Sequence, residues 1–294
     1  MGGLVKAANR RFVRRLSPRA RRRIAAVLPA RTFAWFRRRR TDVYLVSFPK
    51  CGRTWLRVLV GRAFQRHFSL PADANLVELH RLSELDPRVP CVFATHDDDA
   101  QWKAPADVER DKARYLGSRV ILLVRDPRDV IVSLYFQKRG RRGGYAGSLA
   151  EFLHDPVGGF ESLLRFYDAW AANLDVPRDV LVVRYEDLHS RPADELRRVL
   201  GFLGVRDVPD GVVDEAVAYG SFGNMRRLEE TDAFRSEKLR ADRPGDYDTY
   251  KTRRGRVGGY RDDLTEDQID TLDRLMAASD AQRFGYGTAA GAPA

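Results

Sequence analysis

The segment from Val43 to Phe64 places the strongest constraint on the fold of this 294-residue chain. Its first six residues are mostly β-branched or aromatic, which predicts a buried strand. From Thr54 onward the apolar residues recur at helical spacing, so a helix is expected to begin there. The turn in between contains Lys50 and Gly52. Because the free amides and the positive end of the helix dipole face the space beyond the strand, this turn predicts an anion site.

This turn is not a Walker A loop, since GxxxxGK[ST] is absent and the lysine precedes the glycine. Taken alone, it could be an ordinary strand-turn-helix junction with a solvated lysine. However, its sequence, Phe-Pro-Lys-Cys-Gly-Arg-Thr-Trp-Leu, resembles the 5′-phosphosulfate loop of sulfotransferases that use 3′-phosphoadenosine 5′-phosphosulfate (PAPS). The resemblance implies that Lys50 neutralises charge on the departing oxygen and that the following residues cradle the 5′-phosphate: Cys51, Gly52, Arg53 and Thr54. Because Cys51 lies at a helix N-terminus, we expect its thiol pKa to be lowered.

A second motif follows the clearest buried strand, residues 119–124. Asp126 as N-cap and Pro127 at the first helical position predict a helix start. The segment Arg-Asp-Pro-Arg-Asp-Val-Ile-Val-Ser resembles the 3′-phosphate motif of the same family, in which the arginine and the serine bind the 3′-phosphate. These residues are Arg125 and Ser133 here. A guanidinium suits a phosphate dianion because it donates two parallel, charge-assisted hydrogen bonds.

A histidine, His96, ends a third predicted strand at residues 89–96. Ligands of open parallel α/β sheets gather beyond the carboxyl ends of the strands, so this position suits chemistry. The family has a Thr-His pair there whose histidine is the catalytic base, which implies that role for His96. Ala94 stands where the family often has a lysine. The acidic run from Asp97 to Asp99 is expected to be an exposed turn, and the alternatives are that it chelates a metal or contacts a cation of the acceptor.

Three further segments resemble parts of the family that enclose the nucleotide. Tyr185 is the last residue of a predicted strand at residues 180–185, and the resemblance places it near the adenine together with Trp55. A Ser-Phe-x-x-Met stretch would enclose the same base, although its apolar residues could equally belong to the core. Arg-Arg-Gly would close over the 3′-phosphate. The first of these stretches contains Ser221, Phe222 and Met225. The second is Arg253, Arg254 and Gly255.

Other signals concern single elements. Residues 160–174 predict an amphipathic helix whose aromatic residues face the core, and Thr265 with Gln268 predicts a capping box for a final helix to about Ala278. Residues 138–147, rich in glycine and arginine, predict a mobile loop.

The net charge of +11 is distributed unevenly. Residues 1–41 contain fourteen basic residues and no acid, so the remaining 253 residues carry a net charge of −3. This argues against a nucleic-acid-binding fold and for local positive potential. Residues 1–41, the basic arm, form either an amphipathic helix on an anionic membrane surface or a solvated basic tail. No apolar stretch approaches the ~20 residues of a membrane span, and two cysteines give no disulfide framework, which suits the cytoplasm.

These features together predict one α/β domain at residues 42–285, with a central parallel sheet flanked by helices in a P-loop-like sulfotransferase fold, and a flexible tail at 286–294. The expected enzyme transfers a sulfuryl group from PAPS to an acceptor hydroxyl, releases 3′,5′-ADP and uses no metal. A P-loop kinase and a nucleic-acid or membrane binder that relies on the arm are the competing hypotheses. The acceptor itself is not evident from the motifs.

Overall fold

The computed structural model describes residues 41–141, 144–234 and 250–287, and between the last two ranges residues 236, 239–241 and 245–246. The basic arm lies outside these residues except for Thr41. Its membrane association therefore stays a prediction.

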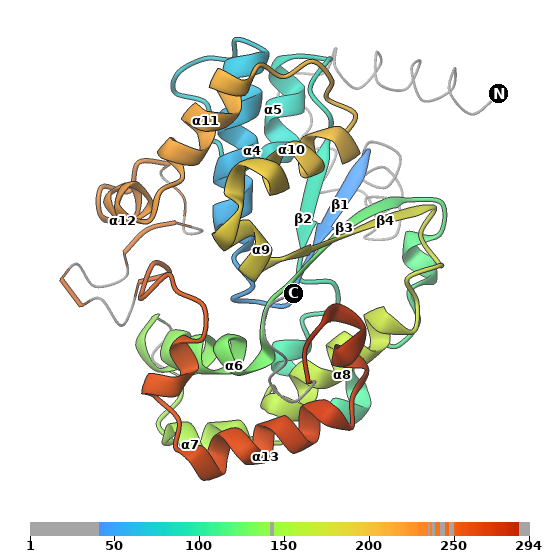
Figure 1. Ribbon diagram of the computed structural model, residues 1–294, viewed down its shortest axis with the longest axis vertical. Coiled ribbons are helices and arrows are strands. Elements are labelled where there is room, and N and C mark those ends of the chain that lie inside the picture. Colours follow the sequence, from blue (N-terminus) through green and yellow to red (C-terminus); the bar gives the residue numbers. More distant parts are fainter. Residues whose placement is uncertain are drawn as a thin grey trace, which may run out of the picture.

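A four-stranded sheet forms the centre of the fold (Figure 1). All pairings are parallel, in the order β2-β1-β3-β4. The strands are β1 (Val43–Val46), β2 (Val92–Thr95), β3 (Arg119–Val124) and β4 (Asp179–Arg184). Five of the six residues of β3 are buried, as a strand covered on both faces requires. The predicted parallel α/β fold is confirmed.

Helices form two groups around this sheet (Figure 1). One group, drawn to the left and upper left of the sheet, comprises α4 (Arg53–His67), α5 (Leu79–Leu85), α9 (Tyr185–Ser190), α10 (Pro192–Phe202) and α11 (Asp210–Tyr219). The other, drawn below it, comprises α6 (Pro127–Phe136), α7 (Leu149–Leu153), α8 (Phe160–Ala171) and α13 (Glu266–Ala277). α12 (Phe222–Glu230) lies at one side, and short 3₁₀ turns include η1 (Ala100–Trp102), η2 (Pro105–Asp107), η3 (Ala113–Tyr115), η6 (Gly259–Asp262) and η7 (Asp280–Phe284).

The predicted helix caps and the predicted buried face of α8 are present in the structure. Asp126 caps α6 by accepting a hydrogen bond from the Arg128 amide at 2.9 Å, with Pro127 in the first turn. Thr265 and Gln268 form the capping box of α13. The aromatic residues Tyr167 and Trp170 of α8 are buried in the core.

Two predicted boundaries were wrong. Part of the expected loop at 138–147 continues α6 as a π-helix, Gln137–Arg141. Gln137, directly after α6, keeps a right-handed helical conformation, so the helix does not end at Phe136. The predicted tail begins too early, since Tyr286 is buried and its hydroxyl donates to Glu186 at 2.6 Å.

The acidic run after β2 is not an exposed turn, which corrects the expectation for Asp97 and Asp98. The Asp97 carboxylate is fully buried and lies 2.7 Å from the ammonium of Lys112, which is also fully buried. Tyr115 and Trp170 donate hydrogen bonds to the same carboxylate, at 2.7 and 3.2 Å. A buried charge is tolerated only with such partners, and they lie too far along the chain for local sequence to reveal.

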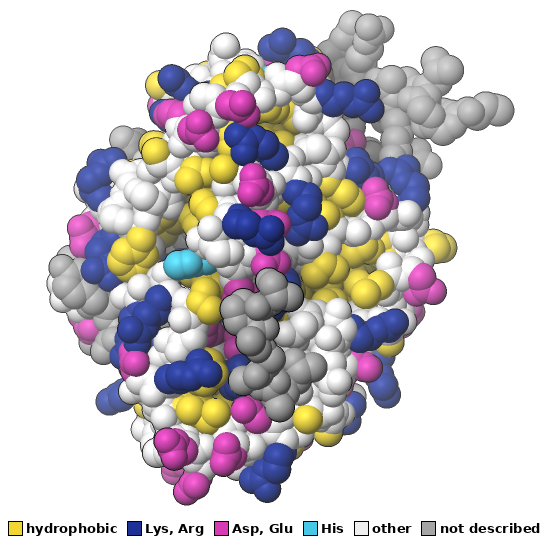
Figure 2. Space-filling model, in the orientation of Figure 1, with side chains coloured by type: hydrophobic (Ala, Val, Ile, Leu, Met, Phe, Trp, Pro, Cys, Tyr) yellow, Lys and Arg dark blue, Asp and Glu magenta, His cyan; other side chains and the backbone are white. Residues whose placement is uncertain are grey.

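Acidic and basic side chains are interspersed over the face of the molecule shown in Figure 2. Within the described residues, no helix is long and apolar enough to cross a membrane.

The Asp97–Lys112 pair allows a stability prediction. Lys112→Met should lower the free energy of unfolding by about 3 kcal/mol, because the buried Asp97 carboxylate then keeps only the partly exposed Arg114, 3.4 Å away, as a cationic partner. Urea unfolding measures this loss, and Asp97→Asn added to Lys112→Met should recover part of it. Arg197→Met is the control, since Arg197 and its partner Asp210 are both exposed, and should cost about 1 kcal/mol or less. Equal costs for Lys112→Met and Arg197→Met would contradict the interpretation.

Candidate active site

The carboxyl ends of the four parallel strands meet at one edge of the sheet. The turn after β1 contains Lys50, while β2, β3 and β4 are each followed directly by a predicted site residue: His96, Arg125 and Tyr185. Residues far apart in sequence are thus brought together by strand polarity alone, as expected for an open parallel sheet.

A cleft of about 910 Å³ opens at this edge, and fifteen of the sixteen predicted site residues line it. Cys51 is the exception. Nine cationic side chains line the cleft, and within the described part of the chain Asp129 is its one carboxylate. The cations are Lys50, Arg53, Arg57, Arg125, Arg240, Lys251, Arg253, Arg254 and Arg256. A chain body with net negative charge therefore concentrates positive charge in one place, as the anion-site hypothesis requires.

The turn before α4 depends on backbone conformations that favour glycine. Gly52 has φ +89°, and a Cβ added there would lie 2.6 Å from the Tyr185 ring. Lys50 also lies in the left-handed region, at φ +72°, which is rare for a residue with a side chain. Because strained backbone clusters at ligand sites, this turn is a strong candidate for anion contact.

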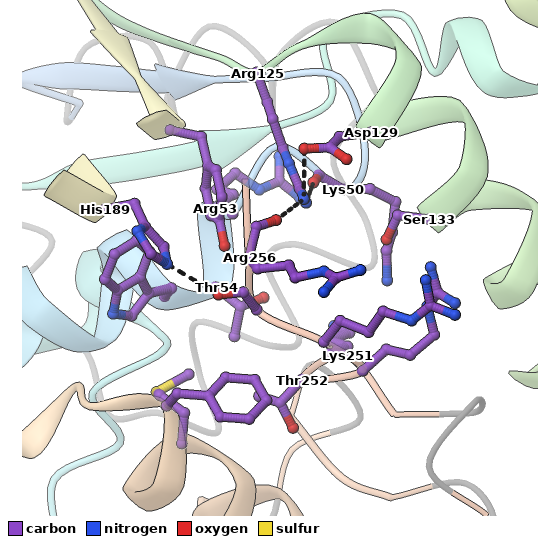
Figure 3. A pocket seen from close by; sticks show the side chains of 18 of the residues that line it. Lys50, Arg53, Thr54, Arg125, Asp129, Ser133, His189, Lys251, Thr252 and Arg256 are labelled. Atoms are coloured by element: carbon purple, nitrogen blue, oxygen red, sulfur yellow. Dashed lines mark hydrogen bonds and ion pairs between the residues drawn. The ribbon is translucent and has the colours of Figure 1, made fainter. Parts of the chain in front are cut away.

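Arg125 connects three segments of the cleft wall (Figure 3). Its guanidinium donates to the Lys50 carbonyl at 3.2 Å and to the Arg256 carbonyl at 3.1 Å. It also pairs with Asp129 at 3.3 Å and lies 4.2 Å from the centre of the Tyr185 ring. In addition to its predicted role toward phosphate, Arg125 therefore organises the site.

Asp129 was missed as a site residue. Its carboxylate is buried and accepts hydrogen bonds from the amides of Gly258 and Tyr260, at 2.9 and 3.0 Å. It thereby fixes the C-terminal basic loop to the start of α6. The second aspartate of the Arg-Asp-Pro-Arg-Asp motif was the available signal.

The predicted adenine residues lie around one end of the cleft. The Trp55 indole donates to the Gly220 carbonyl at 2.8 Å, and its ring centre lies 5.7 Å from that of Tyr185. Phe222 is 40% exposed and packs so closely on Gly255 that a Cβ there would lie 2.2 Å from the Phe222 ring. Met225, by contrast, is buried in a small core with Val58, Leu228 and neighbours, so most of its surface is committed to packing.

The two predicted arginines of the C-terminal loop already have acidic partners. Arg253 lies 3.3 Å from Asp263, and Arg254 lies 3.0 Å from Asp262 and 2.8 Å from Asp263. The carboxylates hold both guanidinium groups at the rim. Ser133 lines the opposite wall from α6, and Figure 3 shows it near Lys50 and Asp129.

His96 is held by a hydrogen bond on each ring nitrogen. Ser47 offers only a carbonyl, at 3.0 Å from Nδ1, so Nδ1 carries the proton. Nε2 therefore has a lone pair, and Arg53 donates to it at 2.6 Å. Burial, followed by the charge of Arg53, lowers the His96 pKa well below 6.5. The neutral imidazole that a general base requires is thus the stable form at neutral pH.

The expectation for Cys51 was wrong. Its side chain points into the core, with the sulfur 3.8 Å from the Tyr167 hydroxyl, and burial raises its thiol pKa to about 12. Desolvation outweighs the helix dipole here, because a thiolate in the core would lose its hydration. Cys51 can contribute its amide to the turn but not its thiol.

Several other lining residues were not anticipated from the sequence. Arg57 lies one turn after Arg53 on α4, where its position appears as an ordinary polar residue of a helix. His189 donates to the Gly255 carbonyl at 3.0 Å and joins α9 to the basic loop. Lys251, Thr252 and Arg256 flank the predicted Arg-Arg-Gly stretch. In the described residues, no three His, Cys, Asp or Glu side chains are grouped as a metal site.

Sequence comparison identifies the family. The family model of the sulfotransferase domain matches residues 40–285. The chain belongs to this family. It is a PAPS-dependent sulfotransferase, which confirms the activity and the sulfuryl donor implied by the two phosphate motifs.

Relatives span most of the chain. It is similar to cytosolic sulfotransferase 17 of Arabidopsis thaliana, at 27% identity over 82% of this chain and 75% of that protein. Flavonol 4′-sulfotransferase of Flaveria chlorifolia is 25% identical over 82% of this chain and 79% of its own length. Mouse sulfotransferase SULT7A1 complexed with PAP has a similar fold, with a TM-score of 0.56 at 22% identity, covering 82% of this chain and 84% of that chain.

The burial of Cys51 leads to a chemical prediction. In the folded protein at pH 8, roughly one Cys51 thiol in 10,000 is ionised if its pKa is about 12, so iodoacetamide should leave it unmodified with or without nucleotide. Mass spectrometry of the alkylated protein measures this, and Cys91→Ala isolates the Cys51 thiol. Alkylation of Cys51 at the rate of an unfolded control would contradict the assigned burial.

The Arg53–His96 contact leads to a second prediction. In the nucleotide-free protein, NMR titration should show His96 as the Nδ1–H tautomer with a pKa below 6.5. Removing the nearby cation should raise that pKa, because the imidazolium is then no longer repelled. Arg53→Gln is the test, and Arg66→Gln, an exposed arginine of the same helix, is the control. An unchanged His96 pKa in Arg53→Gln would show that the contact does not form in solution.

Proposed function

We propose that this sulfotransferase transfers the sulfuryl group of PAPS to the hydroxyl oxygen of an acceptor, with His96 as general base and Lys50 as the cation at the leaving group. The observation that carries this proposal is the convergence of the Lys50 turn, His96 and Arg125 on one cationic cleft at the strand ends. Group transfer of this kind requires mainly positioning and charge stabilisation, which such a cleft supplies.

The residues present fit a nucleotide that is anionic at both ends. At one end, the Lys50–Thr54 turn offers backbone amides, a lysine and a glycine that admits no side chain. At the other, Arg125, Ser133, Arg253 and Arg254 offer a hydroxyl and three guanidinium groups. The rings of Trp55, Tyr185 and Phe222 line the same cleft, and a base can stack on them. When bound there, PAPS supplies the sulfuryl group and departs as 3′,5′-ADP.

His96 is arranged for one proton transfer. The Ser47 carbonyl holds the Nδ1 proton, which leaves the Nε2 lone pair to accept the proton of an acceptor hydroxyl. Lys50 stabilises negative charge that develops on the leaving oxygen.

Nucleotide binding separates this proposal from the kinase alternative. A sulfotransferase should bind 3′,5′-ADP more tightly than ATP with Mg²⁺, since a 3′-phosphate is what Ser133, Arg253 and Arg254 are placed to contact. Calorimetric titration with both nucleotides measures the preference. Tighter binding of ATP would refute the proposed donor site.

Two substitutions test the proposed catalytic roles. His96→Ala should lower kcat ~100- to 10,000-fold and preserve 3′,5′-ADP affinity, because the imidazole acts on the acceptor. Lys50→Ala should lower kcat about 100- to 1,000-fold by removing charge stabilisation. Transfer of label from PAPS measures both rates. His154→Ala, an exposed histidine near α7, is the control and should behave as wild type. Wild-type turnover in either site variant would refute the role of that residue.

A further inference from the structure

The Nε2 lone pair that the reaction requires is occupied in this structure. The Arg53 guanidinium donates to it at 2.6 Å, while Nδ1 is held by Ser47. An acceptor hydroxyl cannot donate its proton to the same lone pair while Arg53 occupies it. Catalysis by His96 therefore requires that the guanidinium move or turn away.

Arg53 is held in surroundings that do not satisfy its charge. Within the described residues, its Nη1 atom is buried without a hydrogen-bond partner, and no carboxylate forms an ion pair with it. Burial, followed by the nearby charge of Arg57, lowers the Arg53 pKa to about 9. A buried cation with an unused donor and no counter-ion is expected to bind an anion from solution.

The surroundings of His96 are cationic as well. Arg57, which pairs with Glu78 at 3.5 Å, lies one turn further along α4, and Lys251 belongs to the C-terminal loop. Both charges lower the His96 pKa together with Arg53. These three residues lie outside the Ser133, Arg253 and Arg254 set assigned to the 3′-phosphate, although all line the same cleft. The acceptor side of the cleft therefore has positive charge beyond that set.

We propose that the acceptor carries an anionic group, such as a carboxylate, in addition to the hydroxyl that receives the sulfuryl group, and that this anion binds Arg53. When the guanidinium pairs with this anion, it moves away from Nε2 of His96 and the lone pair becomes free. Binding of an anionic acceptor therefore makes His96 available as the general base. The hydroxyl proton then passes to Nε2 as the new oxygen–sulfur bond forms. The bond from sulfur to the phosphate oxygen breaks, with its electron pair leaving on 3′,5′-ADP.

This inference depends on the proposed sulfuryl transfer and adds the charge class of the acceptor. It also gives Arg53 a side-chain role in acceptor selection, separate from the amide that the phosphate cradle uses. The main competing occupant of Arg53 is the sulfate end of the donor, so the experiment must distinguish an effect on acceptor from an effect on PAPS.

The test uses matched phenols with and without a negative charge. 4-Hydroxyphenylacetate, 3-(4-hydroxyphenyl)propionate and 4-(4-hydroxyphenyl)butyrate are compared with their methyl esters, which retain the phenol and remove the charge. With saturating PAPS, kcat/KM for at least one acid should exceed that of its ester by about tenfold or more, which corresponds to about 1.4 kcal/mol. In Arg53→Gln this ratio should fall toward one, and Arg53→Lys should restore part of it.

Arg66→Gln is the matched control, because it removes an exposed arginine of the same helix and should preserve the acid-to-ester ratio. Three results would overturn the inference: equal rates for acid and ester, a preference that persists in Arg53→Gln, or no turnover of any acid in the set. A higher KM for PAPS in Arg53→Gln with an unchanged ratio would assign Arg53 to the donor instead. Binding of 3′,5′-ADP is measured in parallel. Its absence in the wild type would refute the proposed function, whereas its presence with no acid preference would refute this inference alone.

Discussion

The arrangement of the cleft depends on the buried charge of Arg125. One guanidinium connects the carbonyls of Lys50 and Arg256 with the carboxylate of Asp129. These partners belong to the β1–α4 turn, the C-terminal basic loop and α6. Asp129 in turn accepts hydrogen bonds from the amides of Gly258 and Tyr260, so this ion pair helps to hold the C-terminal basic loop against the sheet, together with the hydrogen bond from His189 to the Gly255 carbonyl. Without these partners the buried charge of Arg125 would cost several kcal/mol. Arrangements of the cleft that separate Arg125 from them are therefore disfavoured.

The cleft gathers nine cationic side chains, most of which pair with a carboxylate, so its positive charge is partly neutralised but still favours anion binding. Arg53 illustrates the balance: burial and a neighbouring arginine work against its charge, and its strongest contact is to the neutral ring of His96. Natural proteins often tolerate such local destabilisation where a ligand supplies the missing charge. The remaining surface, where acids and bases are mixed, has no comparable concentration on the face shown in Figure 2.

Much of the fold followed from local sequence signals. The apolar runs of β1 to β4 and the caps at Asp126 and Thr265 depend on residues adjacent in the chain, and all were predicted. The location of Lys50, His96, Arg125 and Tyr185 followed from their positions after strands, and the family resemblance supplied the other site residues that line the cleft. Besides the two boundaries, the predictions for Asp97 and Cys51 failed, because their environments are made by residues such as Lys112 and Tyr167 that no periodicity connects to them.

The sequence by itself determined which strands and helices form, which family the chain belongs to and which residues gather at the sheet edge. Strand polarity explains why this was possible, since parallel strands deliver the residue after each strand to one place. Only the tertiary structure decided the direction of individual side chains: Cys51 into the core, Asp97 onto a buried lysine and Arg53 onto His96. Whether a side chain is buried or paired with a charge depends on the residues around it in space. Contacts between distant parts of the chain decide which residues those are.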